Sequence, residues 1–170
     1  MKIQKGTSEH RPKVYALLQR AFPGSSHEAA LVQKLHEHNK LLQEWVCIQT
    51  NKVIAYLAFS NAYHGKAVCG LHLALMAVAP DFQRQGVGRE LLTFALRQES
   101  IKNQPLFVLG ETTYFQRYGF EPCNQPICPF AASNTRFLSM RNDGATSFTV
   151  GYEPEFTSVL ASTGQRRKRR

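Results

Sequence analysis

The most informative stretch of this chain is Val78-Ala79-Pro80-Asp81-Phe82-Gln83-Arg84-Gln85-Gly86-Val87-Gly88-Arg89. An apolar run from residue 71 to Val78 precedes it, and a helical pattern of apolar residues follows it. The pattern predicts a strand, a tight turn and a helix, with two glycines at the helix entrance. Several backbone N–H groups have no intrahelical partner there, and the positive end of the helix dipole adds to them. The sequence therefore predicts a binding site for a phosphorylated ligand at this elbow.

Length and composition favour a single globular domain. The chain has 170 residues, of which 43% are hydrophobic. That length is ample for one hydrophobic core. No apolar run approaches the ~20 residues of a membrane span, which argues against a membrane partner. Charged residues interrupt the first eleven positions, as no signal peptide would allow, so we expect a cytoplasmic protein.

The four cysteines do not suggest a disulfide framework or a metal site. Cys47 and Cys69 lie in apolar, strand-like runs, where a free thiol behaves as a small hydrophobe. Cys123 and Cys128 are too widely spaced for a C-x-x-C pair and have no matching cluster elsewhere. We expect no metal ion.

The positive charge is concentrated at the carboxyl end. The formal net charge is +9, and Arg166 to Arg170 supply five of these charges, so the remainder carries about +4. Residues 161–170 are therefore expected to be a basic, disordered tail after a domain of residues 1–160. A solvated tail explains this run more simply than a nucleic-acid contact, so a nucleic-acid partner is not expected. The sequence leaves the oligomeric state open, a homodimer included.

Periodicity and turn residues predict an α+β domain with a mixed, largely antiparallel sheet flanked by helices. We expect strands at 2–5, 45–49, 53–60, 72–78, 105–110, 137–141 and 148–152, and helices at 7–22, 25–38, from the elbow to about 98, and 112–118. Thr50-Asn51-Lys52 reads as a hairpin turn, and Asp143-Gly144 as a second turn.

A Gly-x-Gly pair alone is a weak signal, but its context is informative. A P-loop would need a Gly-Lys-Ser/Thr ending, and a Rossmann fingerprint would need a third glycine. The segment Gln83-Arg84-Gln85-Gly86-Val87-Gly88, preceded by Val-x-Pro, closely resembles the Gln/Arg-x-x-Gly-x-Gly/Ala signature of the GCN5-related N-acetyltransferases (GNAT superfamily).

A second signature lies downstream. The segment Val108-Leu109-Gly110-Glu111-Thr112-Thr113-Tyr114-Phe115-Gln116-Arg117-Tyr118-Gly119-Phe120 is similar to a pattern of the YhbS-like branch of that superfamily. Residues 28–35 and 151–156 also look like this branch, so the resemblance spans residues 1 to about 157. It implies the GNAT (acyl-CoA N-acyltransferase) fold.

The resemblance also implies a ligand, acetyl-CoA, as acyl donor. Its pyrophosphate would meet the backbone amides of Arg84, Gln85, Gly86, Val87, Gly88 and Arg89. In the family, a bulged strand before the elbow splays from its neighbour and holds the pantetheine arm, which maps onto Met76 and Val78. One of these amides would polarise the thioester carbonyl, and the two arginines add charge near the phosphates.

Catalytic groups are less clearly marked. The amine acceptor must lose a proton before it attacks. Glu111, at the end of a strand, is a candidate base, although we favour its being a helix cap. His72 is a second candidate that points either into the acceptor groove or into the core. Many family members place a thiolate-protonating tyrosine where this chain has Phe115; Tyr114 could substitute, although a packing role fits the sequence better.

The resemblance implies an acetyl-CoA-dependent N-acetyltransferase in which a primary amine, on a small molecule or a peptide, attacks the thioester directly. The chain departs from the branch at Phe115 and at Leu75, where the branch often has proline. Phe115 and the lack of an obvious base leave an alternative open. That alternative is an acyl-CoA-binding sensor or scaffold with weakened catalysis. The acceptor is not readable from the sequence, and we expect its specificity to come from the first two helices and the segment after Cys123.

Overall fold

The computed structural model describes residues 1–131 and 134–159. The expected basic tail, residues 161–170, lies outside the described residues. The strands are β1 (Lys2–Lys5), β2 (Leu42–Gln49), β3 (Lys52–His64), β4 (Ala67–Val78), β5 (Leu106–Leu109), β6 (Glu121–Pro122) and β7 (Phe137–Met140). The helices are α1 (Arg11–Ala21), α2 (His27–Glu37), α3 (Val87–Leu96) and α4 (Thr112–Gln116), with 3-10 turns η1 (Ser8–His10), η2 (Pro80–Phe82) and η3 (Asn134–Arg136).

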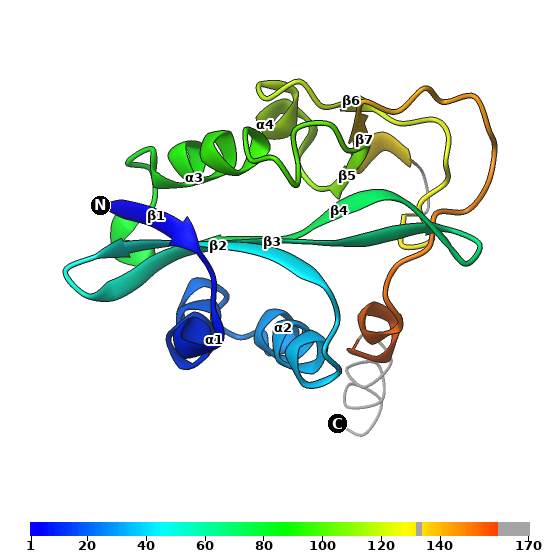
Figure 1. The fold of residues 1–170 in the computed structure, drawn as a ribbon. Coiled ribbons are helices and arrows are strands. Elements are labelled where there is room, and N and C mark those ends of the chain that lie inside the picture. The colour runs from blue at the N-terminus through cyan, green and yellow to red at the C-terminus, as the bar shows by residue number, and fades with distance from the viewer. Residues whose placement is uncertain (132–133, 160–170) are drawn as a thin grey trace.

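The strands form one sheet of seven in the order β1-β2-β3-β4-β5-β7-β6. Only the β4–β5 pair is parallel; the other neighbours are antiparallel. Helices α1 and α2 cover one face, together with the helical residues 154–159, and α3 lies on the opposite face (Figure 1). The expected mixed, largely antiparallel α+β architecture is confirmed.

The largest difference from the sequence-based elements lies in the central hairpin. Strands β3 and β4 extend to His64 and back from Ala67, so they meet at a tight turn at Gly65, which has φ +62°. We expected these strands to be much shorter. The expected turn at Thr50 and Asn51 is confirmed, and both residues have positive φ.

The expected strand at 148–152 is reduced to isolated bridges. Gly151 pairs with Tyr63, and Thr149 pairs with Ile127. A helix at 154–159, which the sequence analysis missed, follows. Helices α3 and α4 each end two residues earlier than expected.

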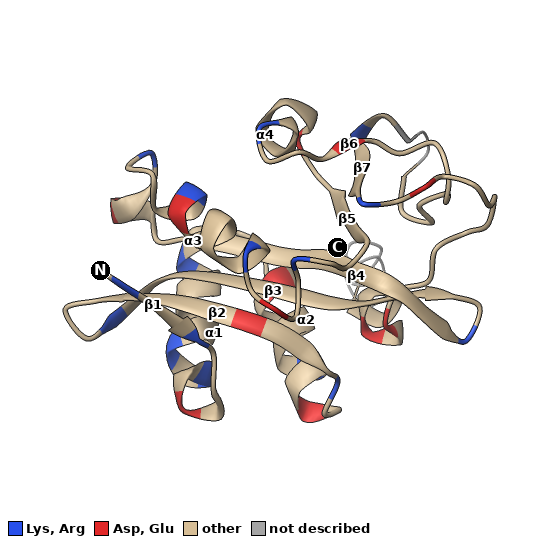
Figure 2. Ribbon diagram, turned by 45° about the horizontal axis from the view of Figure 1, so that its top comes forward, with Lys and Arg blue, Asp and Glu red and all other residues tan. Residues whose placement is uncertain are grey.

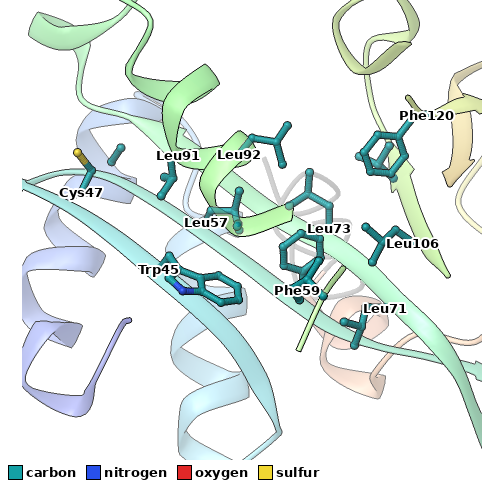
Figure 3. Packing of buried hydrophobic residues seen from close by; sticks show 14 of the residues in the cluster. Trp45, Cys47, Leu57, Phe59, Leu71, Leu73, Leu91, Leu92, Leu106 and Phe120 are labelled. Carbon is teal, nitrogen blue, oxygen red and sulfur yellow. The ribbon is translucent and has the colours of Figure 1, made fainter. Parts of the chain in front are cut away.

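The core is divided by the sheet into two main layers. One cluster, between the sheet and α3, includes Trp45, Phe59, Leu91 and Leu92 (Figure 3). The other lies under α1 and α2 and includes Leu18. Burial of these side chains stabilises each by about 1.5–3 kcal/mol relative to exposure, so the two layers fix the central hairpin in place.

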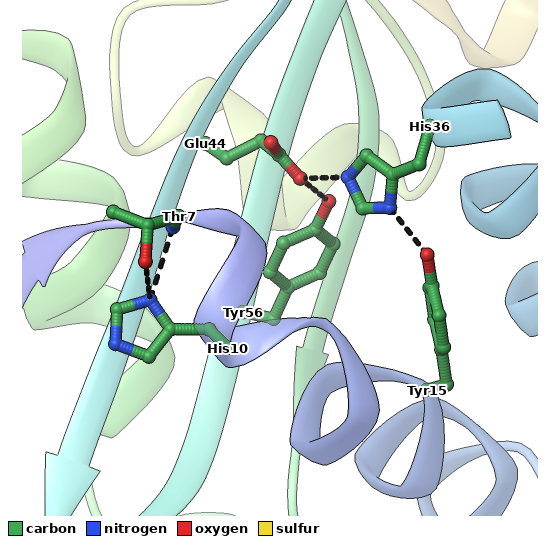
Figure 4. Close-up of polar contacts among 6 residues, drawn as sticks. All are labelled: Thr7, His10, Tyr15, His36, Glu44 and Tyr56. Atoms are coloured by element: carbon green, nitrogen blue, oxygen red, sulfur yellow. Dashed lines mark hydrogen bonds and ion pairs between the residues drawn. The ribbon is translucent and has the colours of Figure 1, made fainter. Parts of the chain in front are cut away.

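A buried polar network ties the first two helices to the sheet. Glu44 Oε1 accepts hydrogen bonds of 2.6 Å from Tyr56 and of 2.6 Å from His36 Nε2, and Tyr15 bonds His36 Nδ1 at 2.7 Å (Figure 4). Burial works to raise the pKa of Glu44, but the hydrogen bonds from His36 and Tyr56 outweigh it and hold the pKa below its ordinary value.

A second network fastens the C-terminal segment to the end of α2. Lys40 Nζ lies 3.1 Å from Glu153 Oε2, and His38 Nδ1 lies 2.8 Å from Glu155 Oε1. Tyr63 also donates a hydrogen bond to Glu153. Both glutamates are 3% exposed, whereas the His38 and Lys40 side chains are 56% and 31% exposed, so solvent reaches each pair from the basic side. The segment is thereby positioned beside α2.

The basic residues of the described part of the chain are spread along it. Its lysines and arginines are distributed over several helices and loops (Figure 2). None of the helices within 1–131 and 134–159 is long and apolar enough to cross a membrane.

Candidate functional site

The site begins where two parallel strands separate. Strands β4 and β5 pair at only two positions, Leu71 with Leu106 and His72 with Phe107. Beyond them, β4 continues to Val78 without β5. In the pairing with β3, the register jumps by one residue at Ala74, which is a β-bulge in β4. The bulge and the split that the family resemblance implied are both confirmed.

The split exposes one edge of β4. Ala79 N donates to Ile54 O at 2.8 Å, and the backbone groups of an antiparallel strand alternate in direction. The peptide groups of Met76 and Val78 therefore face away from β3, toward the gap left by β5. The Gln83 side chain donates to one of them, Val78 O, at 3.0 Å, which fixes the elbow to the strand end.

The elbow is a concave run of backbone amides. Arg84 and Gly86 have φ of +61° and +83°, and Gly86 is the N-cap of α3. The first bond of the helix runs from Glu90 N to Gly86 O, so the amides of residues 87–89 precede the hydrogen-bonded ladder. Left-handed residues within such a run produce the anion-binding concavity known as a nest.

A cavity of about 710 Å³ lies in front of the elbow and the strand edge. Its wall includes Met76, Val78 and the elbow from Gln83 to Arg89 except Gln85, so the structure brings these predicted residues together. Gln85 instead points its amide to Asp81 O at 2.9 Å. The sequence analysis missed four further lining residues, which are Phe82, Thr93, Arg117 and Tyr118. Arg117 and Tyr118 lie on or just after α4, one helical turn beyond Tyr114, and that spacing was the available signal.

The residue of α4 that faces this cavity is Tyr114, and Phe115 does not line it. A Cβ added at Gly88 would lie 3.5 Å from the Tyr114 hydroxyl and 3.8 Å from Met76 Cε, so all three border the same space. Phe115 packs the other way, against Gly110 and Phe120. The Tyr114 ring also packs against the core cluster and on the Phe115 ring, with centroids 5.0 Å apart, as the sequence analysis expected. Helix α4 begins at Thr112, and this start directs residue 114 toward α3.

The hydroxyl of Tyr114 is held in its protonated form. Burial is the main cause that raises its pKa. Tyr118 donates a hydrogen bond of 3.2 Å to the same hydroxyl. Because Tyr118 is the donor in this pair, the Tyr114 hydrogen remains free for another acceptor.

A second cavity, of about 470 Å³, opens on the opposite side of the split. Residues 72–75 of β4 and 107–109 of β5 form its inner wall, and Leu75 is among them. The outer wall comes from α2 and the C-terminal segment, with Glu28, Leu31, Tyr152 and Phe156. The two cavities therefore flank the same stretch of β4, where Leu75 lines one and the next residue, Met76, lines the other.

His72 lines the second cavity from within the core. It is 1% exposed and stacks on Tyr152 with ring centroids 3.7 Å apart. Its Nε2 bonds Gly151 O at 3.0 Å, so Nε2 carries the hydrogen and Nδ1 is an unprotonated acceptor without a partner among the described residues. Burial lowers the pKa of His72 to about 4, so the imidazole is neutral near pH 7.

Glu111 stands apart from both cavities. It is exposed and is absent from the walls of either cavity. Its backbone forms the N-cap of α4, but its carboxylate accepts from Thr113 Oγ1 at 2.9 Å and caps no helix amide. The side-chain cap expected from the sequence is therefore not formed.

Cysteines contribute nothing to either cavity wall. None of the four forms a disulfide within the described residues, and Cys47, Cys123 and Cys128 are buried. Within the described ranges, no three histidine, cysteine or acidic side chains gather as a metal site would require.

Comparison with known proteins agrees with this geometry. The family model described as an acetyltransferase (GNAT) domain matches residues 41–122, from before β2 to the end of β6. The solved structure of the GNAT family N-acetyltransferase YhbS from Escherichia coli, in complex with CoA, has a TM-score of 0.83 and 26% identity over 92% of this chain and 91% of that chain. These matches support the assignment of the chain to the GNAT superfamily.

Two further GNAT proteins are similar. A GNAT family acetyltransferase from Brucella melitensis, solved with acetyl-CoA, has a TM-score of 0.75 and 22% identity over 91% of this chain and 97% of that chain, which supports the fold. The N-acetyltransferase YjhQ of Escherichia coli K12 is 36% identical over 110 residues. The matched region covers 61% of this chain and 60% of YjhQ, so the chain matches about three fifths of that relative's length.

Proposed function

We propose that this chain is an acetyl-CoA-dependent N-acetyltransferase that acetylates a primary amine. The observation that carries the proposal is the arrangement of an amide nest, an exposed strand edge and a protonated tyrosine along one cavity. The likeness to YhbS, which was solved with CoA, supports the choice of ligand.

The nest is suited to the pyrophosphate of CoA. Amides at a helix N-terminus bind anions through direct hydrogen bonds and the helix dipole. Arg84, Arg89 and Arg117 supply positive charge along the same wall. Arginine binds phosphate through paired hydrogen bonds, so these three side chains suit the several phosphate groups of the ligand.

The exposed strand edge is suited to the rest of the ligand. Peptide groups of Met76 and Val78 face the gap, where the amides of a pantetheine arm can pair with them as a further strand would. An N–H group of this edge can also stabilise the negative charge that develops on the thioester oxygen. Such a donor can lower the barrier by about 3 kcal/mol.

The reaction proposed is direct aminolysis. The amine nitrogen forms a bond to the acetyl carbon, the carbon–sulfur bond breaks, and the sulfur leaves as a thiolate. Tyr114 gives its proton to that sulfur, and the acetylated nitrogen loses a proton to solvent. Tyr114 faces the cavity, keeps its proton at neutral pH and has that proton free, which are the properties of a general acid.

The structure favours neither predicted base for a charged amine. Glu111 lies outside both cavities, and His72 has a pKa of about 4. A group with so low a pKa accepts a hydrogen bond readily but removes a proton from an ammonium poorly. We therefore propose that His72 orients the amine or a water molecule at its Nδ1 and that the proton leaves through water.

Thermal shift with acetyl-CoA, followed by thiol release with amines, tests the proposal. A ligand that binds only the folded state raises Tm. A rise in Tm and amine-dependent release of CoA are expected. Absence of any rise at saturating acetyl-CoA would overturn the ligand assignment. A rise without thiol release for any amine would leave the sensor or scaffold as the better account.

A further inference from the structure

The cavity bounded by β4, α2 and the C-terminal segment is not used by the acyl donor. Because it flanks the same stretch of β4 as the donor cavity, at Leu75 and Met76, a molecule bound in it would reach the thioester from the side opposite the elbow. The inference below rests on the proposed function, which places an amine at this junction.

The wall of this cavity is mostly hydrocarbon and aromatic. Phe107, Phe130, Tyr152 and Phe156 all line it. The ring of Tyr152 contacts Phe130 and Phe156 at centroid distances of 4.7 Å and 5.1 Å, so the aromatic groups form one continuous surface. The Tyr152 hydroxyl is already engaged with Cys128 Sγ at 3.5 Å, and it therefore offers little polarity to a ligand.

The charge of the wall is small and negative. Glu28 is the only carboxylate, and no lysine or arginine among the described residues lines the cavity. Ser25 Oγ donates to Glu28 Oε2 at 2.7 Å, which holds the carboxylate in place at the start of α2. The remaining polar side chains of the wall are His27 and His72, and the Nδ1 atom of His72 is itself buried. Glu28 therefore supplies one negative charge, which is too few to balance a ligand with several positive charges.

The volume limits the size of the ligand. About 470 Å³ lies within the range of pockets for small molecules, roughly 300–1,000 Å³. A ring with a short aminoalkyl chain fits such a space. A sugar with many hydroxyl groups would leave those groups unpaired against the aromatic wall, which is costly.

We propose that the acceptor is a small apolar primary amine with a single positive charge, such as an arylalkylamine. Its ring lies among Phe130, Tyr152 and Phe156. Glu28, the carboxylate in the wall, attracts the ammonium form as the amine enters. Polyamines, aminoglycosides and lysine side chains of peptides are poor acceptors.

The first test compares amines at saturating acetyl-CoA by thiol release. We expect kcat/KM for 2-phenylethylamine to exceed that for spermidine, kanamycin and a lysine-containing peptide by at least about 100-fold. Lengthening a linear alkylamine from ethylamine to hexylamine should raise kcat/KM, since a methylene in an apolar pocket is worth about tenfold or more. A polyamine, aminoglycoside or peptide as the best acceptor would overturn the proposal.

Variants on α2 test the role of the carboxylate. Glu28→Gln should raise KM for 2-phenylethylamine about tenfold and leave the Tm shift with acetyl-CoA unchanged. Glu37→Gln is the matched control, because Glu37 lies on the same helix, is exposed and does not line the cavity. Leu31→Glu, one turn from Glu28, should move the preference toward diamines. Equal KM values for Glu28→Gln and Glu37→Gln would show that Glu28 does not bind the amine.

A binding measurement separates this inference from the proposed function. With CoA bound, calorimetric titration of 2-phenylethylamine should show binding that Phe156→Asp abolishes. Acetyl-CoA binding and thiol release with only polyamines or peptides would refute the acceptor class and leave the acetyltransferase intact. Absence of acetyl-CoA binding would refute the proposed function itself. Absence of amine binding to the CoA-bound protein would refute the acceptor class whether or not thiol is released.

Discussion

Tyr118 donates a 3.2 Å hydrogen bond to the hydroxyl of Tyr114, and both tyrosines border the cavity in front of the amide nest. The pair makes Tyr114 a donor whose own hydrogen is uncommitted. Under the mechanism that we propose, Tyr114 takes the place of the tyrosine that many family members have at position 115.

Tyr114→Phe should lower kcat about 100-fold, the low end of what general acid catalysis supplies, because a coenzyme thiolate is a tolerable leaving group. The Kd of acetyl-CoA should change little. Steady-state thiol release and calorimetric titration of acetyl-CoA measure the two quantities. A variant that retains wild-type kcat would remove Tyr114 from the reaction.

Tyr118→Phe is the control for that variant, and its effect on kcat should be much smaller because Tyr118 acts through Tyr114.

Phe115→Tyr should give no gain in kcat, although the family pattern favours tyrosine there. The Phe115 ring packs against Gly110 and Phe120, so an added hydroxyl would be buried without a designed partner.

Gly86→Ala and Gly24→Ala form a matched pair. Both glycines have φ +83°, and an added Cβ meets nothing within 4 Å at either position. Each substitution should cost about 1 kcal/mol of stability, the ordinary cost of a left-handed conformation. Only Gly86→Ala should also weaken acetyl-CoA binding, by at least about tenfold or ~1.4 kcal/mol. Equal Kd values for the two variants would mean that the phosphates bind elsewhere.

Arg117→Ala should weaken acetyl-CoA binding several-fold at low ionic strength and less at high salt, because salt screens exposed charges. Arg97→Ala, at the far end of α3, should not change the Kd. Titrations at two salt concentrations give the comparison. A salt-independent loss in Arg117→Ala would point to packing instead of charge.

We expect His72 to contribute to the loss of folding stability at acidic pH. Its pKa falls from 6.5 to about 4 on folding, so below pH 6.5 the unfolded chain binds a proton that the folded chain does not. The folded state therefore loses stability as the pH falls from 6.5 to about 4, by roughly 3 kcal/mol in total, and gains nothing from this group above 6.5.

Urea unfolding of His72→Phe against pH checks this component, since the variant should show a flatter slope between pH 6.5 and 4. His64 is exposed, so the control variant His64→Gln should retain the wild-type dependence of stability on pH. Glu44 and Glu155, whose pKa values are lowered, contribute in a separate window. Their stabilisation is present above about pH 4.5 and disappears as the pH falls through their folded pKa values.

Gly70→Ala should destabilise the fold by about 1–3 kcal/mol or more through overpacking. A Cβ at Gly70 would lie 2.4 Å from the backbone carbonyl oxygen of Pro105, at the point where β4 and β5 begin to pair. Gly110→Ala should cost less, because its close neighbour is the end of the Phe115 ring, which can rotate. Chemical denaturation of both variants tests the order.

Much of the fold was predictable because it depends on local patterns. Gly86 and Gly88 after an apolar strand predicted the elbow, and the turn at Asn51 was predicted from its residue types. The segment at 148–152 was mispredicted, since its alternation suggested a strand but only single bridges to Tyr63 and Ile127 form. That outcome depends on contacts distant in sequence, such as the ion pair between Lys40 and Glu153.

The candidate site likewise has a part that the sequence predicts and a part that it does not. Backbone elements of the donor cavity follow from a contiguous motif, so residues 83–89 could be named in advance. The direction of Tyr114 depends on where α4 begins and on how α4 lies against α3, which no local pattern specifies. The burial of His72 required knowing that Tyr152 stacks on it from the other end of the chain.

The gap between β4 and β5 has a consequence for how this protein can change over generations. The cavity proposed for the donor is lined by residues of β4, the elbow, α3 and the α4 region, whereas the cavity on the opposite side of β4 is walled by α2 and by residues 152–159. Substitutions in those two segments can alter the accepted amine while the shared donor machinery stays intact. Because β4 borders both cavities, the preference for the amine can change while the residues proposed to bind the acyl donor stay the same.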